Sequence, residues 1–358
     1  MFPNKTGEVG SIKLVCIDNW ISYGILQLLY DRCINFYYVN DSKIFNQKSA
    51  EVSRSHGTIC ASILAETMPD SAELTTISTT DGNRPIMIGN VCIALEWCMN
   101  ESPDYLCMSI GSENWLETEE LGKLTKQLAD KGTRIFAACA NNGHIVFPAA
   151  YPWVTGIRYE PGTACLYQEK NSPIGSNLIV GDFTTSVLEQ LAAENSFFKC
   201  RTNSMATPYA LGKMLSKDLA LADLPMWEGR NSPKKVGEWP MPVVALCGPF
   251  QQMKELLALL QKESYQAALL TSRSETDWIR MVLHTTFKNL SEWVKPLEKA
   301  GILLIDAESS LDSIQECADC LIDFRKQNVS AAYREILEFF GTEEVKEKAE
   351  SQADVLRL

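Results

Sequence analysis

Three residues that could cooperate in proton transfer lie far apart in the chain, and one of them is a serine. Ser204 lies in RTNSMATPYALG (201–212), where a helical pattern begins. A serine at a helix start can be an N-cap, because its oxygen accepts from the free N–H groups of the first turn. A serine hydroxyl can also attack a carbonyl carbon, but only when a base within hydrogen-bond distance takes its proton. Ser204 is therefore a helix cap or a nucleophile, and it is a nucleophile only if the fold places a base within hydrogen-bond distance.

Only three histidines can supply that base. His284 lies in RMVLHTTF, where a helical pattern favours a structural role, and His144 follows NNG in a predicted loop. His56 lies in RSHGTICASILAE, where His-Gly-Thr begins a predicted helix. A helix start fixes the backbone and leaves one side of the ring open, which suits proton transfer. Asp18 lies at the end of the buried run KLVCID, and taken alone it is an N-cap or a hydrogen-bonded core carboxylate.

The order Asp18, His56, Ser204 resembles that of the subtilisin-like serine peptidases. Further segments resemble this family in the same order: DYLCMSIGS (104–112), RIFAACANNG (134–143), FPAAYPWVTGI (147–157) and SMATPYALGKML (204–215). One such motif alone occurs in unrelated proteins, so the weight lies in the ordered set. The resemblance covers roughly residues 10–222 and leaves the rest of the chain unassigned.

The resemblance implies a role for each residue. Ser204 attacks the scissile carbonyl, His56 takes its proton and delivers it to the leaving amine, and Asp18 holds the imidazole tautomer. Asn141 offers its amide to the developing oxyanion, with the backbone N–H of Ser204 as the second donor.

The resemblance also implies a binding edge for the substrate. Ser109, Ile110 and Gly111 form an edge along which an extended peptide adds as a strand.

Several residues next to these motifs depart from the family pattern. Asn19-Trp20 follow Asp18 where the family has Thr/Ser-Gly, Thr202-Asn203 precede Ser204 where the family has Gly-Thr, and Ala140 replaces a Gly. One interpretation is an active enzyme with narrow specificity. The other is a catalytically impaired pseudoprotease that binds peptides without cleaving them.

The elements that must position these residues follow from the hydrophobic pattern. Short buried runs at 12–17, 72–79, 105–111, 134–140 and 177–182 predict strands, and periodic segments such as 58–68 and 118–132 predict crossover helices. This alternation predicts an α/β fold with a mostly parallel sheet. Together with the motifs it indicates a subtilisin-like three-layer sandwich, with a catalytic domain at residues 1–222.

Beyond this domain the pattern changes. Residues 223–240 concentrate Pro, Gly and charge, which indicates a linker. Residues 241–358 then predict a smaller βαβαβα domain, with strands at 241–248, 265–272 and 301–307. Its first turn, CGPFQQMKEL, contains neither GxGxxG nor GxxxxGK[ST], which argues against nucleotide binding. Substrate recognition, stability and oligomerisation remain open as roles for this domain.

Composition narrows the partners and the compartment. A net charge of −12 over 358 residues disfavours nucleic acid and anionic membranes as partners. The 12 cysteines lie mostly in apolar runs, and MFPNKTGEVG at the start has no signal-peptide pattern, so we expect a cytoplasmic protein with free thiols. We expect no cofactor and no metal site; structural calcium is common in the family, but no motif here identifies a calcium site.

The sequence therefore predicts a cytoplasmic serine endopeptidase that acts on a peptide or protein substrate. A specific precursor peptide is the favoured substrate, for example in leader removal during the maturation of a ribosomally made natural product.

Overall fold

A computed structural model gives two compact units. It describes residues 11–47, 55–80, 85–163, 166–170, 172–194, 201–227, 239–307, 314 and 318–340. The first unit comprises Met1–Gly111, Glu120–Asn141 and Pro148–Glu228, and the second comprises Ser112–Glu119, Asn142–Phe147 and Gly229–Leu358. Of the predicted linker 223–240, residues 228–238 lie outside the described residues.

The first unit is built on a sheet with nine described strands in the order β3-β2-β4-β1-β5-β6-β7-β9-β8. All neighbours pair in parallel except β2 with β3 and β8 with β9. The mostly parallel α/β fold predicted from the sequence is confirmed. The strands are Ile12–Asp18 (β1), Ile34–Asn40 (β2), Lys43–Asn46 (β3), Ala72–Ser78 (β4), Tyr105–Met108 (β5), Arg134–Ala138 (β6), Val154–Tyr159 (β7), Leu166–Gln168 (β8) and Ser176–Val180 (β9).

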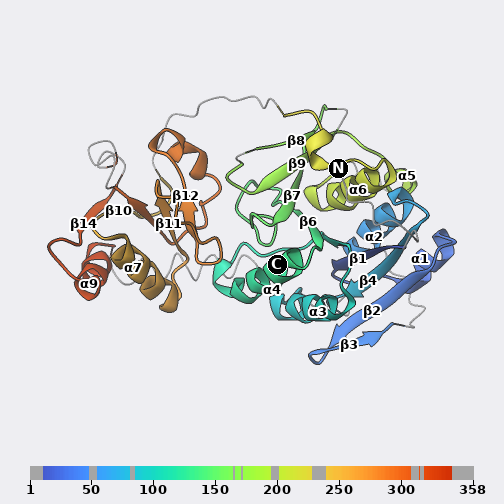
Figure 1. Cartoon of the computed structure of the whole chain (residues 1–358), viewed down its shortest axis with the longest axis horizontal. Coiled ribbons are helices and arrows are strands. Elements are labelled where there is room, and N and C mark those ends of the chain that lie inside the picture. The colour runs from blue at the N-terminus through green and yellow to red at the C-terminus, as the bar shows by residue number, and fades with distance from the viewer. Residues whose placement is uncertain are drawn as a thin grey trace. The chain divides into compact units, whose positions relative to one another are not determined.

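Helices cover both faces of this sheet (Figure 1). On one face α2 (His56–Thr67) packs against α6 (Asn203–Ser216), with α1 (Tyr23–Leu29) and α5 (Ser186–Glu194) beside α2. On the other face lie α3 (Ile88–Glu101) and α4 (Glu119–Asp130). Parallel strands covered on both faces are expected to be apolar throughout, and the last five residues of β1 are all buried. Short 3₁₀ helices are found at Trp115–Glu117 and Leu221–Asp223.

The predicted buried strands coincide with β1, β4, β5, β6 and β9, and β7 follows the FPAAYP segment as expected. Strands β2, β3 and β8 were not predicted. β2 is only partly buried and β3 and β8 contain no buried residue, so none of them has the continuous apolar run on which the prediction relied.

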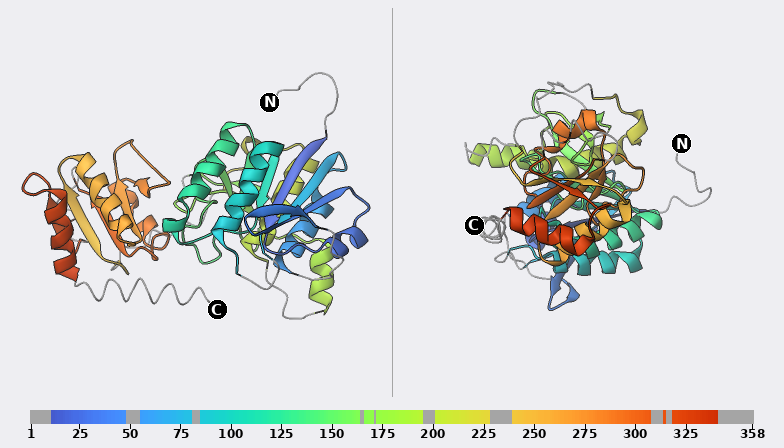
Figure 2. Two further views of the ribbon diagram at one scale, coloured as in Figure 1. Left: turned by 90° about the horizontal axis from the view of Figure 1, so that it is seen from below. Right: turned by 90° about the vertical axis from the view of Figure 1, so that its left-hand side faces the viewer.

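In the described part of the second unit, five strands form a parallel sheet in the order β12-β11-β13-β10-β14. Its strands are Val243–Cys247 (β10), Ala267–Thr271 (β11), Val282–His284 (β12), Ile302–Asp306 (β13) and Cys320–Asp323 (β14). Helices α7 (Phe250–Lys262) and α9 (Val329–Phe340) contact each other beside this sheet (Figures 1 and 2).

Two details of the second unit correct the sequence interpretation. The sheet has five strands where three were predicted, because β12 and β14 are only three and four residues long. The helical interpretation of His284 is wrong, since His284 ends β12, and the segment that follows is a 3₁₀ helix at Phe287–Trp293. Among the described residues, no helix has the length and apolar character needed to cross a lipid bilayer.

Candidate active site

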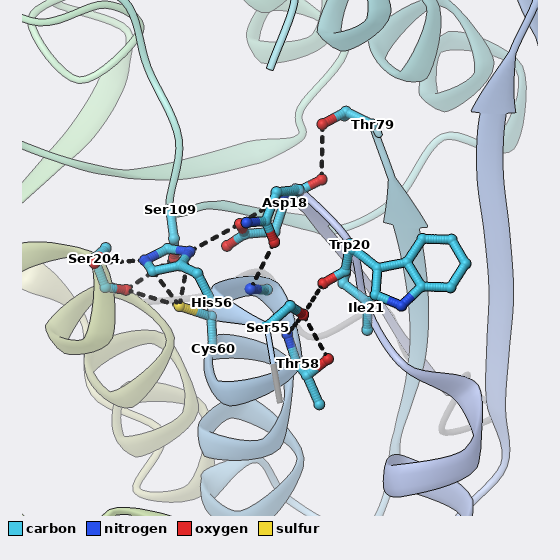
Figure 3. Close-up of polar contacts among 12 residues, drawn as sticks. Asp18, Trp20, Ile21, Ser55, His56, Thr58, Cys60, Thr79, Ser109 and Ser204 are labelled. Carbon is cyan, nitrogen blue, oxygen red and sulfur yellow. Dashed lines mark hydrogen bonds and ion pairs between the residues drawn. The ribbon is translucent and has the colours of Figure 1, made fainter. Parts of the chain in front are cut away.

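Asp18, His56 and Ser204 lie in one hydrogen-bonded line in the first unit (Figure 3). His56 Nδ1 lies 3.0 Å from Asp18 Oδ1, and His56 Nε2 lies 2.8 Å from Ser204 Oγ. With Nδ1 protonated and donating to the carboxylate, Nε2 is the free acceptor that faces the serine hydroxyl. The geometry therefore suits transfer of the Ser204 proton to His56.

Asp18 is placed by the central strand β1. Its carboxylate is fully buried, and Oδ1 also accepts from the backbone N–H of Asn19 at 2.7 Å. The Asp18 carbonyl accepts from both the N–H and the hydroxyl of Thr79, which fixes the end of β1 against the neighbouring strand β4. Oδ2 has no hydrogen-bond partner among the described residues.

His56 is the first residue of α2, and Ser55 is its N-cap. The Ser55 hydroxyl accepts from the N–H of Thr58 at 3.2 Å and donates to the Trp20 carbonyl. Gly57 lies against the end of β1, because a Cβ there would come within 2.9 Å of Asp18 Cβ and 2.8 Å of the Trp20 carbonyl. The glycine of the His-Gly-Thr motif thus allows α2 to approach Asp18 closely.

Asn19, a departure from the family pattern, has a clear structural role. Its Oδ1 accepts from the N–H of Gly57 at 2.8 Å and so satisfies one of the free donors in the first turn of α2. Trp20 is 8% exposed and belongs to the buried core. The Asn19-Trp20 pair therefore ties the end of β1 to the start of the helix that carries His56.

Ser204 is the second residue of α6, one turn before an internal proline. Pro208 has no N–H, so the carbonyl four residues earlier, that of Ser204, loses its usual helical donor. The Ser109 hydroxyl donates to this carbonyl at 2.8 Å, and the Cys60 thiol does so at 3.5 Å. These two side chains hold the first turn of α6 from the directions of β5 and α2.

The helices that carry His56 and Ser204 approach each other closely at a second glycine. A Cβ on Gly212 would lie 2.0 Å from Thr67 Oγ1, so no larger residue fits there without displacing α2 from α6. The Thr67 hydroxyl is meanwhile bonded to the Ile63 carbonyl in its own helix. The close packing of α2 against α6 therefore depends on this contact.

Asn141 lies beside the start of α6. Its Oδ1 accepts from the N–H of Asn203 at 3.0 Å, which leaves the Nδ2 amide without a hydrogen-bond partner among the described residues. The N–H of Ser204 likewise has no acceptor in the described part of the chain. Two N–H donors near the start of α6 are thus without an acceptor among the described residues, and unoccupied donors are what an oxyanion hole would use.

Asn203, a second departure from the family pattern, holds this arrangement. Its Nδ2 donates to the carbonyls of Cys139 and Ala140 at 2.9 and 3.0 Å, and its Oδ1 accepts from the N–H of Tyr159 at 2.8 Å. One buried side chain therefore joins the segment that ends in Asn141 to the start of α6.

The predicted substrate edge follows directly after β5. Ser109 and Ile110 are 7% and 6% exposed, and Gly111 is exposed. No backbone hydrogen bond of Ile110 or Gly111 is present within the described residues. Their backbone groups remain available for pairing with an extended peptide, whereas the Ser109 side chain is occupied by the Ser204 carbonyl.

The charge state of the site is governed by Asp18 and by burial. An ionised Cys60, and the hydrogen bond and charge of Asp18, raise the pKa of His56, while burial lowers it. Burial raises the pKa of Cys60 to about 11, so this thiol is neutral at pH 7. Asp18 is therefore the anion that acts on His56 in the physiological range, and it favours the imidazolium that forms when Ser204 loses its proton.

Comparison with solved structures finds subtilisin-like proteases. The chain is similar to the subtilisin-like protease Apa1 from the Antarctic psychrotroph Pseudoalteromonas sp. AS-11 (17% identity, TM-score 0.33), and the match covers 42% of this chain and 36% of Apa1. It is similar to a lanthipeptide protease (14%, TM-score 0.40, 56% of this chain and 71% of that one). It is also similar to the nisin leader peptidase NisP from Lactococcus lactis (13%, TM-score 0.38, 57% and 76%).

No protein-family model and no curated protein matches the chain. Structure comparison thus finds the same kind of protein that the sequence motifs resemble, at low identity.

One group of potential metal ligands is found among the described residues. Donor atoms of Asp18, His56 and Cys60 lie within 4.8 Å of one another. Both ring nitrogens of His56 already have partners, Asp18 at Nδ1 and Ser204 at Nε2. We therefore describe this group as part of the hydrogen-bonded line and assign no metal to it.

The other two histidines are not in this group. His144 belongs to the second unit, where its ring nitrogens lie 3.1 Å from Glu113 and 3.2 Å from Glu298. His284 is exposed at the end of β12. Of the three histidines, His56 alone lies beside Asp18 and Ser204.

Sequence reasoning missed two contacts of the site. Cys60 Sγ lies 3.9 and 3.8 Å from the two ring nitrogens of His56, and Thr202 Oγ1 lies 2.8 Å from Ser204 Oγ. A signal existed for Cys60, which follows His56 by four residues and so shares its helix face. Thr202 was noticed only as a departure from the family pattern, because the direction of its hydroxyl does not follow from the sequence.

Proposed function

We propose that this chain is a serine endopeptidase that cleaves peptide bonds through an acyl-enzyme intermediate. The observation that carries the proposal is the line from Asp18 Oδ1 through both ring nitrogens of His56 to Ser204 Oγ. A hydroxyl at 2.8 Å from a free imidazole nitrogen, itself held by a buried carboxylate, is the arrangement that activates serine for attack on a carbonyl.

The steps follow from this geometry. As Ser204 Oγ attacks the scissile carbonyl carbon, its proton passes to His56 Nε2, and the carbonyl electrons move to the oxygen. Asn141 Nδ2 and the Ser204 N–H stabilise that oxyanion. His56 then gives the proton to the leaving amine as the C–N bond breaks. In the second half a water molecule loses its proton to His56 and releases the acyl group from Ser204.

Positioning of the substrate completes the mechanism. We assign pairing with an extended peptide to the backbone of Ser109, Ile110 and Gly111. The hydrogen bond from the Ser109 hydroxyl to the Ser204 carbonyl holds this segment next to the first turn of α6.

We also propose that the natural substrate is a particular precursor peptide from which a leader is removed. NisP, one of the matched structures, is named a leader peptidase, and this supplies the substrate class to test. The second α/β unit and the net charge of −12 suit recognition of a specific, basic segment better than general proteolysis.

A cytoplasmic setting is part of the same proposal. It is supported by the cysteines, since those whose state the structure gives are free thiols and most of them are buried. Alkylation of the native protein before and after reduction, followed by mass spectrometry, tests this: equal labelling is expected, and a thiol that reacts only after reduction contradicts it.

Two experiments on the full chain test the enzymatic proposal. A fluorophosphonate probe is expected to label the wild type and not Ser204→Ala. Absence of labelling in folded wild type would favour the pseudoprotease. Casein and a random peptide library are then digested and the cleavage sites mapped by mass spectrometry. Cleavage at a restricted set of sites supports specific processing, and degradation of both without preference contradicts it.

A further inference from the structure

Thr202 is the N-cap residue of α6, two positions before Ser204. A threonine at this position normally accepts a hydrogen bond on its side-chain oxygen from an N–H of the first turn. The Thr202 side chain makes no such bond. The N–H groups of Met205 and Ala206 bond instead to the Thr202 backbone carbonyl, at 3.1 and 3.0 Å.

The Thr202 hydroxyl is directed at the nucleophile instead. Its Oγ1 lies 2.8 Å from Ser204 Oγ, the same distance that separates Ser204 Oγ from His56 Nε2. Ser204 Oγ thus has two hydrogen-bond partners on different elements, a base on α2 and a hydroxyl at the start of its own helix.

The direction of the bond follows from proton accounting. The Ser204 hydroxyl has one hydrogen, and this hydrogen must point to His56 Nε2 if His56 is to accept it. Ser204 Oγ is then the acceptor of the second bond, and Thr202 Oγ1–H is the donor.

We propose that Thr202 is a further catalytic residue, which donates a hydrogen bond to the attacking oxygen of Ser204. The inference rests on the proposed function. As the Ser204 proton moves to His56, negative charge develops on Oγ before the bond to the carbonyl carbon is complete, and the Thr202 hydrogen bond stabilises it. In deacylation the same bond stabilises Oγ as it leaves the acyl carbon and regains a proton from His56. Thr202 keeps its own proton throughout.

The role also explains a departure from the family pattern. A glycine at position 202 has no hydroxyl to offer, so the resemblance alone assigns no such donor. Asn203 meanwhile orients the segment that ends in Asn141. Thr202 therefore acts on the nucleophile, and Asn203 acts on the segment that ends in Asn141.

The test compares Thr202→Val, which keeps the branched shape and removes the hydroxyl, with Thr202→Ser, which keeps the hydroxyl. The rate of fluorophosphonate labelling is measured against probe concentration in the full chain, to separate the maximal rate from probe affinity. A hydrogen bond to a developing charge is worth about a 10- to 100-fold change in rate, so Thr202→Val is expected to lower the maximal rate by that factor. Probe affinity is expected to stay the same, and Thr202→Ser to stay within about threefold of wild type.

Helix stability separates this role from a structural one. Since the hydroxyl does not cap α6, Thr202→Val is expected to keep the melting temperature and circular dichroism of the wild type. If Thr202→Val lowers the melting temperature, Thr202→Ala and Thr202→Ser are compared at a temperature where all are folded, and a rate that follows the hydroxyl supports the inference.

The outcomes distinguish the two proposals. Wild-type labelling with an unchanged rate in folded Thr202→Val overturns the role of Thr202 and leaves the peptidase proposal intact. Equal loss in Thr202→Ser and Thr202→Val also overturns it. Absence of labelling in folded wild type overturns both proposals.

Discussion

Each of the two units contains a buried parallel strand that ends in an aspartate, and the two aspartates have different hydrogen-bond partners. Asp18 ends β1 and meets His56, whose other ring nitrogen faces Ser204. Asp306 ends β13, is 5% exposed, and accepts from Thr271 at 2.9 Å and from Arg273 at 2.7 Å. The strand end is the same kind of position in both sheets, so the neighbour decides the chemistry.

The difference lies in what the partner can do with a proton. An arginine stays charged at any accessible pH, so Asp306 and Arg273 form a fixed ion pair. A histidine changes its charge near neutral pH, so the pair of Asp18 and His56 can take up and release a proton. In the first unit, His56 Nε2 also faces the Ser204 hydroxyl at 2.8 Å.

The largest expected effect distinguishes His56, at the start of α2, from His284, at the end of β12. His56→Ala removes the base and is expected to lower kcat by about a million-fold, because serine without a base does not attack. His284→Ala, at the exposed end of β12, is expected to leave kcat unchanged. Turnover of a mapped peptide substrate measures both. A comparable loss of kcat in His56→Ala and His284→Ala would contradict the assignment of catalysis to the first unit.

The next effect separates the two aspartates. Asp18→Asn keeps the shape but changes the tautomer favoured at His56, and is expected to lower kcat/KM by about 10⁴-fold with little change in folding. Asp306→Asn is expected to keep the activity and to lower the free energy of unfolding by about 1 to 3 kcal/mol, since charge-assisted hydrogen bonds are lost. Kinetics and urea denaturation of both variants check this. An inactive Asp306→Asn in a folded protein would contradict the comparison.

A smaller effect is expected at the oxyanion donor. Asn141→Ala is expected to lower kcat by about 100- to 1000-fold with a nearly unchanged KM, because the amide acts on the transition state. Asn100→Ala, at an exposed asparagine near the end of α3, is the matched control and is expected to have no effect. A change confined to KM would place Asn141 in substrate binding instead.

The smallest effect is a shift in pH dependence. His56 must be neutral to accept the Ser204 proton, so activity is present above its pKa and is lost as the pH falls through it. Asp18 raises this pKa, so the midpoint of kcat/KM is expected above the usual value of about 6.5 and lower in Asp18→Asn. Because Cys60 is neutral there, Cys60→Ala is expected to keep the wild-type midpoint. If Cys60→Ala shifts the midpoint and Asp18→Asn does not, the anion that raises the pKa of His56 is the Cys60 thiolate.

The sequence predicted the parts of the fold that depend on continuous apolar runs. The central strand β1, the start of α2 and the start of α6 follow from buried runs and helix signals, and Asp18, His56 and Ser204 lie at their ends. The short strands β12 and β14 were missed because three or four residues do not make a pattern that differs from a helix segment.

The site was predicted as a set of residues and not as a set of contacts. The bond from Ser109 to the Ser204 carbonyl depends on the gap that Pro208 leaves in the helical bonding. The bond from Thr202 to the Ser204 hydroxyl depends on the rotamers of two side chains at the start of one helix. Neither side-chain rotamers nor the packing of β5 against α6 is encoded by spacing along the chain.

The most direct test of the central claim locates the nucleophile itself. The full chain is reacted with a fluorophosphonate, digested, and the adduct mapped by tandem mass spectrometry, with His56→Ala as a parallel sample. We expect a single adduct on Ser204 in the wild type and almost none in His56→Ala. An adduct on another residue, or equal modification of Ser204 in both samples, would contradict activation of Ser204 by His56.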